Sequence, residues 1–457
     1  MMRSDVLGNP VTAGSDASLA GINDFVTGFL GYETQAINAL AAADADPGCS
    51  LLNSYAACLH LFSEDRNGPG NARPYLDRAL AAARDASARE QLNAAAVAAW
   101  AAGDIPRALR IAAEIAAIAP RDLVSVKFAQ YHAFNMGDAP AMLAIADRVA
   151  SENDTNPHLH GMLAFGYEQC HLLDLAEASA MRAIDLRRKE PWAHHAMAHV
   201  MLTQGRIEEG LGFMRAMSDT WTGLNSFMVT HNWWHLALYL ISLGRYDEAL
   251  AAYDDHVWGV LKDYSQDQIG AISLLLRLEL VGVDVGGRWD DVAAHLAGRT
   301  DDFVQPFLTM QYVYGLARGP GVAAEALVAN LRAFAPRSPA HAREVWTAVA
   351  LPACEAMLAH ARGRHEEVVA RLMPLMPQMI RIGGSHAQRD LFEQVLLDSV
   401  IMTGRHSLAQ QMLELRRGYE PCSVPGNDKL ARIYESLGLP REAARAQARV
   451  KRVLAAG

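Results

Sequence analysis

The sequence predicts an all-α protein, built as a curled solenoid of helix pairs. The chain has 457 residues, 51% of them hydrophobic, and it is rich in Ala, Leu, Met, Glu and Arg. That composition favours packed helices. The length exceeds what one ordinary hydrophobic core needs, so we expect several domains or a repeat array. A short phrase also returns along most of the chain, which is typical of repeat architectures.

The recurring phrase is a small residue, Gly, a polar residue, three variable positions, and then Ala and Leu or similar residues. Its copies are marked by Gly103, Gly137, Gly205, Gly244, Gly363, Gly404 and Gly438. The first two and the last two of these glycines are 34 residues apart. A helix that stops and reverses usually ends on a left-handed residue, which costs a residue with a Cβ about 1 kcal/mol or more. The phrase therefore predicts the turn inside each helix pair.

This spacing and residue pattern resemble tetratricopeptide repeats, in which helix pairs stack into an α-α superhelix. In that family the first helix has large apolar residues 11, 8 and 4 positions before the turn glycine, and a small residue at 7. Counting back from Gly244 gives Trp233, Leu236, Leu240 and Ala237. The repeat length varies further along the chain, so the resemblance implies a long and irregular solenoid.

The domain organisation follows from where the repeats begin. Residues 1–80 predict helices at about 22–43, 51–62 and 72–83, which we interpret as an N-terminal helical cap. Residues 81–457 are the predicted solenoid, and two lobes at about 81–260 and 261–457 stay an open alternative. The first 16 residues lack the apolar run of a signal peptide, and other apolar runs are too short for a membrane span. We therefore expect a cytoplasmic protein.

Charge and cysteine content narrow the classes of partner. Lys and Arg number 41 against 51 Asp and Glu, the net charge is −10, and no block of basic residues occurs. Nucleic acids and anionic membranes need a clustered basic surface, so we expect neither as a partner. The five cysteines are scattered and include no C-x-x-C pair, which favours reduced thiols. Proteins, peptides or small molecules remain as partners, and a homo-oligomer stays open.

A more specific resemblance comes from three phrases. They are PWAHHAMAHV at 191–200, HNWWHLAL at 231–238 and IGGSHAQRD at 382–390, with RDLV at 121–124 and SLLLRL at 273–278 in support. Together they are similar to the tetratricopeptide-repeat protein 38 family, from about residue 80 to the C-terminus. The chain departs from that family at 307–311, FLTMQ, where an acidic residue and a histidine are expected. The resemblance implies the fold but no settled activity.

Tetratricopeptide repeats line their concave groove with first-helix residues 13, 10, 6, 3 and 2 positions before the turn, because these share one face. We counted back from each turn and took Leu173 as the turn residue of a repeat without glycine. The predicted groove then collects Lys127, Tyr131, His160, Tyr167, His171, Trp192, His195, His199, His231 and Trp234. Imidazole and aromatic rings suit a planar or partly apolar ligand. Packing between repeats is the alternative for Trp192 and Trp234, and we expect His194 and His235 to be satisfied, semi-buried residues.

Three histidines in this set are also candidates for metal binding and for catalysis. His195 and His199 are four residues apart, so two imidazoles can face one metal, with a third ligand from His231 or His160. No H-E-x-x-H motif occurs, and a divalent metal stays an open alternative. His195, His199 and His231 are also the candidate catalytic residues, because histidine can act as acid or base. The sequence has no nucleophile elbow, Walker loop or dinucleotide fingerprint.

The stretch from Gly383 to Asp390 opens a helix. Ser385 and Gln388 have the spacing of a capping box, which accounts for both residues structurally. His386 and Arg389 lie beside the free N–H groups of the helix start, so we predict that they bind a carboxylate or phosphate. The alternative is a structural pair between Arg389 and an acidic residue.

Three functions are consistent with these residues. The first is a binding solenoid that holds a small, partly aromatic or anionic molecule, or a peptide, in the groove. The second is an enzyme that uses His195, His199 and His231, with or without a metal, on a substrate anchored by His386 and Arg389. The third is a scaffold for protein–protein interaction. The sequence does not identify the ligand.

Overall fold

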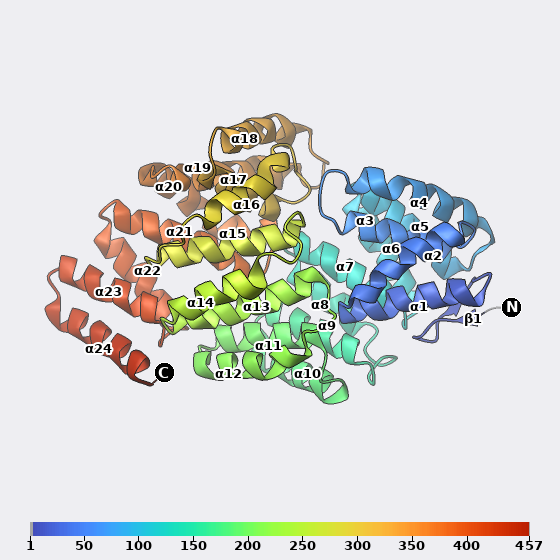
Figure 1. Cartoon of the computed structure of the whole chain (residues 1–457), viewed down its shortest axis with the longest axis horizontal. Coiled ribbons are helices and arrows are strands. Elements are labelled where there is room, and N and C mark those ends of the chain that lie inside the picture. Colours follow the sequence, from blue (N-terminus) through green and yellow to red (C-terminus); the bar gives the residue numbers. More distant parts are fainter. Residues whose placement is uncertain (1–2, 457) are drawn as a thin grey trace. The chain divides into compact units, whose positions relative to one another are not determined.

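The computed structural model describes residues 3–456, which are helical over most of their length (Figure 1). Strands β1 (Arg3–Ser4) and β2 (Pro10–Val11) form a short antiparallel pair with Arg3 opposite Val11. The α-helices are α1 (Asp16–Gly31), α2 (Asn38–Ala45), α3 (Ser50–Leu61), α4 (Gly68–Ala82), α5 (Ala88–Ala101), α6 (Ile105–Ile118), α7 (Leu123–Asn135), α8 (Ala139–Asp147), α9 (Pro157–Gln169), α10 (Leu173–Leu186), α11 (Pro191–Thr203), α12 (Ile207–Met217), α13 (Ser226–Ser242), α14 (Tyr246–Ala252), α15 (Ser265–Leu280), α16 (Arg288–Leu296), α17 (Pro306–Arg318), α18 (Ala323–Phe334), α19 (Leu351–Ala361), α20 (His365–Leu372), α21 (His386–Met402), α22 (His406–Arg417), α23 (Val424–Ser436) and α24 (Pro440–Ala456). Short 3-10 segments are η1 (Thr34–Ile37), η2 (Ala83–Asp85), η3 (Ser218–Thr220), η5 (Ala297–Arg299), η6 (Ala335–Arg337) and η8 (Met373–Ile382), and π-helical turns are η4 (Tyr253–Val257) and η7 (Val345–Ala350).

These helices form twelve successive pairs, and each pair turns on a residue with left-handed backbone. The turn residues have φ between 52° and 88°, and they are Tyr32, Glu64, Gly103, Gly137, His171, Gly205, Gly244, Gly282, Gly321, Gly363, Gly404 and Gly438. All seven turn glycines predicted from the recurring phrase are confirmed. The sequence missed Gly282 and Gly321, whose surroundings do not follow the phrase, and the turns at Tyr32 and Glu64, and it misplaced the turn at His171.

The turn between α9 and α10 corrects one of our counts. His171, with φ of 57°, is its left-handed residue, so taking Leu173 as the turn was wrong by two positions. The turns at 103, 137, 171 and 205 are then evenly 34 residues apart. Histidine tolerates this backbone region better than most residues with a Cβ. Position 13 of this repeat therefore falls on His158 instead of His160, and position 6 on Phe165 instead of Tyr167.

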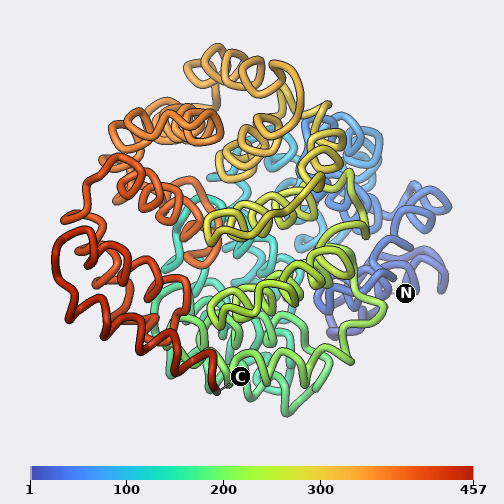
Figure 2. Tube along the Cα trace, turned by 60° about the vertical axis from the view of Figure 1, so that its left-hand side comes forward, coloured from blue at the N-terminus to red at the C-terminus, as the bar shows by residue number. Residues whose placement is uncertain are grey.

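The chain divides into two compact units. The first comprises Met1–Ala196, Thr220–Met228 and Pro339–Ala342, and the second comprises Met197–Asp219, Val229–Ser338 and Arg343–Gly457. The division passes through α11 and α13, so each of these helices contributes residues to both units. We describe each unit by itself. Figure 2 traces the consecutive helix pairs along the chain.

The first unit stacks the pairs α3/α4, α5/α6, α7/α8 and α9/α10, with the second helix of one pair against the first helix of the next. Its hydrophobic core extends from Val11 to Leu163 and includes the stacked rings of Phe25 and Tyr55, whose centroids are 4.1 Å apart. This core crosses residue 80, so the predicted boundary between cap and solenoid has no counterpart in it. The N-terminal cap stays a prediction.

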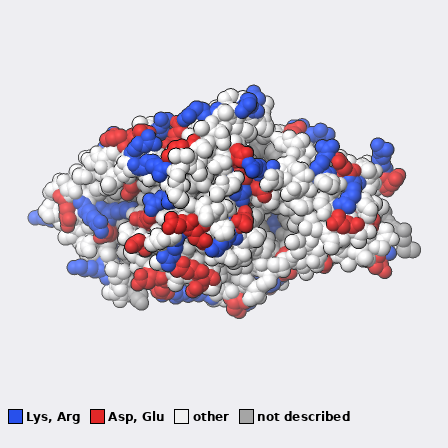
Figure 3. Space-filling model, turned by 45° about the horizontal axis from the view of Figure 1, so that its top comes forward, with Lys and Arg blue, Asp and Glu red and all other residues white. Residues whose placement is uncertain are grey.

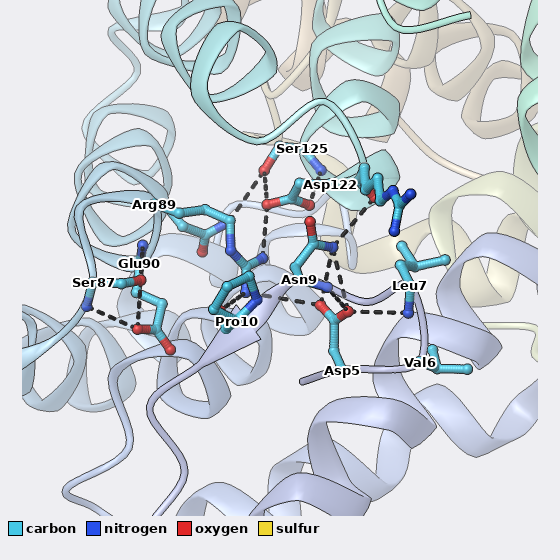
Figure 4. A network of polar contacts seen from close by, with 12 residues as sticks. Asp5, Val6, Leu7, Asn9, Pro10, Ser87, Arg89, Glu90, Asp122 and Ser125 are labelled. Carbon is cyan, nitrogen blue, oxygen red and sulfur yellow. Dashed lines mark hydrogen bonds and ion pairs between the residues drawn. The ribbon is translucent and has the colours of Figure 1, made fainter. Parts of the chain in front are cut away.

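A buried polar network fixes the β1–β2 hairpin to this unit (Figure 4). The guanidinium of Arg89 donates to Asp122 at 2.9 Å and to the carbonyl of Pro10 at 3.1 Å, and it lies 3.8 Å from Asp5. Asp122 also caps α7, because it accepts a hydrogen bond from the backbone N–H of Ser125 at 3.1 Å. One arginine therefore connects the hairpin, α5 and α7.

In the second unit the first helices of four consecutive pairs pack side by side. Helix α15 contacts α17, α17 contacts α19, and α19 contacts α21, while α15 also contacts α21 directly. The inner layer is thus curled so tightly that the first and fourth of these helices meet. Over residues 3–456, no helix combines the length and apolar character needed to cross a bilayer. Basic and acidic side chains are mixed on the face drawn in Figure 3.

Candidate functional site

Four histidines of the second unit form what we call the imidazole cluster: His199, His231, His235 and His386. The ring centroid of His235 lies 4.5 Å from that of His199 and 4.8 Å from that of His231, and His199 lies 5.2 Å from His386. His199, His231 and His235 are buried. Helices α11, α13 and α21 supply these residues, so the cluster joins segments far apart in the sequence.

Helix α13 builds one wall of the cluster. His231 and His235 are four residues apart and therefore share a face of the helix. The indole of Trp234 stacks on His231 at 5.3 Å, with 6° between the rings, and meets His235 edge-on at 4.8 Å. Burial and the neighbouring His199 lower the pKa of His231 to about 3. His231 is therefore a neutral imidazole at pH 7.

His386 is the first residue of α21, directly after its cap. The predicted capping box is confirmed, because Ser385 accepts from the N–H of Gln388 and Gln388 accepts from the N–H of Ser385. The Nε2 of His386 lies 3.0 Å from the hydroxyl of Thr203, at the end of α11. Arg389 donates to the backbone carbonyl of Gly384. The anion-binding role of His386 and Arg389 stays a prediction.

A buried arginine lies against the same indole. Arg277 on α15 is 3% exposed and donates to Asp390 at 2.8 Å and to the carbonyl of Ala387 at 2.7 Å. Its guanidinium carbon is 5.6 Å from the ring centre of Trp234, within the range of a cation–π contact. Asp390 also accepts a hydrogen bond from Arg416. Burial raises the pKa of Asp390, but the two arginines outweigh it and hold that pKa well below its usual range.

Sequence reasoning missed Arg277 and Arg416 and undervalued Asp390 and His235. A lone arginine within the apolar run 271–278 was a usable signal, since a buried arginine requires a partner. His235 was expected to be a satisfied residue outside the groove, yet it lies at the centre of the imidazole cluster. A repeat pattern could show its neighbours His231 and Trp234 on the same helix, but not His199, which comes from α11.

Two buried polar groups on α13 lack partners among the described residues 3–456. Asn232 is fully buried, and neither its amide nitrogen nor its amide oxygen forms a hydrogen bond. The indole N–H of Trp234, which is also buried, has no acceptor. A buried polar group left unsatisfied costs about 1–3 kcal/mol. Groups of this kind next to a functional cluster are therefore candidates for ligand contact.

The first unit holds its own ring-rich set. Trp192 stacks on His195 at 4.4 Å, with Phe165 at 4.7 Å and Tyr32 at 5.2 Å from the indole. His195 is buried in this aromatic environment. It belongs to the first unit, whereas His199 and His231 belong to the second. The three-histidine set proposed for catalysis or metal binding stays a prediction.

Lys127 of the first unit hydrogen-bonds to the C-terminal end of helix α1. Its ammonium donates to the carbonyls of Phe29 at 2.7 Å and Leu30 at 3.1 Å, in the last turn of α1. It also lies 3.4 Å from the ring centre of Tyr32. Burial lowers the pKa of Lys127 well below its usual value. These contacts terminate a helix, and the ligand-binding role predicted for Lys127 stays a prediction.

The remaining predicted groove residues also have local partners. The hydroxyl of Tyr131 donates to Glu64 at 2.6 Å, and Nε2 of His160 lies 2.6 Å from the carbonyl of Asp154. Tyr167 packs at the edge of the hydrophobic core. The miscounted turn explains why His160 and Tyr167 were selected. The ligand-binding roles predicted for His160 and Tyr167 depended on that count, so they have no support from the corrected one.

His194 is a satisfied residue, as expected, but it is fully buried and not semi-buried. Trp221 donates its indole N–H to Nδ1 of His194 at 3.2 Å, and Nε2 lies 2.8 Å from the carbonyl of Arg188. Because Nδ1 accepts, the proton must be on Nε2, which donates to the carbonyl. His194 thus fixes a local turn of the first unit.

No family model matches the chain. Among solved structures, a human IFIT1 dimer with PPP-AAAA is 12% identical over 97% of this chain and 96% of that chain, with a TM-score of 0.40. Naa15/Naa10 bound to HypK-THB is 12% identical over 94% and 68%, with a TM-score of 0.25. The TPR domain of P58(IPK) is 12% identical over 80% and 96%, with a TM-score of 0.21. Membership of the tetratricopeptide-repeat protein 38 family stays a prediction. The twelve helix pairs over residues 3–456, with their left-handed turns, make the chain an α-solenoid of the tetratricopeptide-repeat kind.

Proposed function

We propose that this protein is a ligand-binding solenoid whose imidazole cluster and Trp234 hold a small planar molecule. The observation that supports this most directly is the Trp234 indole N–H on α13, which is buried and has no acceptor among the described residues. The indole stacks on His231, which is neutral. A ligand with a hydrogen-bond acceptor would satisfy this N–H group.

The chemistry of the surrounding residues limits the kind of ligand. Neutral imidazoles offer one donor and one acceptor each, and the indole and imidazole faces favour a flat ring. Arg277 adds a positive charge beside Trp234, which favours a carboxylate. This charge is already paired with Asp390, so the attraction is moderate. We therefore expect aromatic monocarboxylates to bind better than their neutral amides, and both better than aliphatic acids.

The enzyme alternative gains less support from these residues. A general base works best when its pKa is near the working pH. The pKa of His231, lowered to about 3, makes this imidazole a weak base at pH 7. The residue therefore fits hydrogen bonding to a ligand better than proton abstraction.

The proposal can be tested with native mass spectrometry of the purified full chain and titration calorimetry with a panel of aromatic carboxylates and amides. Trp234→Phe keeps an aromatic ring, although a smaller one, and removes the N–H, and we expect at least tenfold weaker binding. Trp289→Phe is the matched control, because Trp289 is another buried indole of the second unit whose N–H has no partner. Equal effects of the two variants, or no binding by any compound in the panel and a bare protein mass, would contradict the proposal.

A further inference from the structure

A second group of metal-ligating side chains lies in the second unit, outside the imidazole cluster. His360 is in the last turn of α19, His365 is the first residue of α20, and Asp398 is on α21. One nitrogen from each histidine and one carboxylate oxygen all lie within 4.8 Å of one another. The Nε2 of His360 is 3.0 Å, and the Nδ1 of His365 is 3.9 Å, from Oδ2 of Asp398.

These separations match the geometry of a tetrahedral metal. Zinc binds histidine nitrogen and carboxylate oxygen at about 2.0–2.1 Å, which puts neighbouring ligand atoms about 3.3 Å apart. The two distances to Asp398 lie on either side of that value. The Nδ1 of His365 also lies 3.1 Å from the hydroxyl of Ser399, so binding a metal requires the imidazole to leave that contact. We propose that His360, His365 and Asp398 form a binding site for a divalent transition metal of the zinc class. Two imidazoles and one carboxylate leave the fourth position for water.

The fold holds the three ligands in position and leaves them accessible. The left-handed Gly363, with φ of 69°, sets the turn between His360 and His365. The side chains of His365 and Asp398 are 20% and 27% exposed, whereas that of His360 is 8% exposed. An ion can therefore enter from solvent. Once bound, it would connect the pair α19/α20 to α21.

The charges at this position act in opposite directions on a bound cation: the carboxylate of Asp398 attracts it, and the ammonium of Lys429 repels it. Burial raises the pKa of Asp398, but the hydrogen bond with His360 and the charges of His360, Lys429 and His365 together outweigh it and lower the pKa, so the carboxylate is ionised at pH 7. Lys429 on α23 interacts electrostatically with Asp398, and burial lowers the pKa of Lys429. The buried Nδ1 of His360 has no partner, so the second shell that usually supports a ligating imidazole is incomplete. We expect weaker binding than at a closed four-ligand zinc site.

The test is a calorimetric titration of Zn²⁺ into the full chain after removal of metals with a chelator. The variants His365→Gln and Asp398→Asn should each weaken one binding equivalent at least tenfold. His406→Gln is the matched control, because His406 follows Gly404 and Arg405 as His365 follows Gly363 and Arg364, and both are half-buried first residues of a helix. It should bind like the unmodified chain.

A second measurement guards against folding defects and against other histidine sites. Co²⁺ titrated into the same variants should give the visible absorption of a tetrahedral site in the unmodified chain and in His406→Gln, and lose it in His365→Gln. Trp234→Phe should keep the signal, which separates this site from the proposed ligand site. Unchanged affinity and absorption in His365→Gln and Asp398→Asn, with their circular dichroism preserved, would overturn the proposal.

Discussion

The two units each bury an arginine that connects distant segments, but they balance its charge differently. In the first unit one arginine, Arg89, serves two aspartates, Asp5 and Asp122. In the second unit Asp390 pairs with two arginines, Arg277 and Arg416, and Arg416 also pairs with Glu420. The first network thus has two carboxylates for one arginine, whereas the second has as many arginines as carboxylates.

The pKa shifts follow that balance. Burial raises the pKa of Asp5, and Arg89 only partly offsets it. Burial also acts on Asp390, but two arginines outweigh it, and its pKa falls well below the usual range. The number of arginines around a buried aspartate, and not burial alone, thus decides the direction of its pKa shift.

Removing the central aspartate should give the largest difference between the units. Asp390→Ala leaves Arg277 and Arg416 without their shared carboxylate, and we expect a loss of about 3–5 kcal/mol in the free energy of unfolding. Asp5→Asn removes a carboxylate whose ionised form is already disfavoured, so roughly 1 kcal/mol is expected. Urea denaturation followed by circular dichroism measures both. If Asp5→Asn costs as much as Asp390→Ala, the charge comparison fails.

A buried histidine of each unit gives the second comparison, with the next largest expected effect. His132 in the first unit is buried and meets Trp100 edge-on at 4.8 Å, and His235 is buried in the imidazole cluster. Replacing either with Ala should lower stability by about 2–3 kcal/mol through lost packing. Only His235→Ala should also weaken the binding of aromatic carboxylates, by at least tenfold in calorimetry. Equal binding by both variants would make His235 a packing residue.

The turns provide a third and smaller contrast. In the first unit Gly103→Ala introduces a Cβ at φ of 74° with only an ordinary contact, 3.8 Å from Cγ of Pro339, so about 1 kcal/mol is expected. In the second unit the Cβ of Gly205→Ala would lie 2.7 Å from the carbonyl oxygen of Tyr419. We expect roughly 2 kcal/mol there, because the backbone must also shift. Thermal unfolding of the two variants should rank them in this order, and the reverse ranking would refute the assigned packing.

The pH dependence of stability is the smallest expected effect. The pKa values of His132 and His231 fall from 6.5 to about 3 on folding, because burial disfavours the charged form. Between these values the unfolded chain binds protons that the folded protein does not, so stability falls as pH falls. Each residue should cost about 1 kcal/mol between pH 6.5 and 5.5. His231→Gln and His132→Gln should each reduce that slope, as measured by urea midpoints at several pH values, and an unchanged slope would argue against burial of a neutral ring.

The sequence by itself determined the helices and most turns of this protein. Local signals suffice there, since a left-handed turn favours glycine and a capping box needs only Ser385 and Gln388. The same signals failed at His171, because a turn without glycine leaves no local mark. That one error put three residues, His160, Tyr167 and His171, into the predicted groove.

Only the tertiary structure decided which side chains meet. His235 acquires its neighbours from α11, and Arg277 acquires Asp390 from α21, because the inner helices of the second unit curl until α15 and α21 touch. His360, His365 and Asp398 likewise meet only once α19, α20 and α21 are packed. A repeat pattern specifies which face of a helix points inward, but the curvature that brings several faces together is the sum of packing across many pairs.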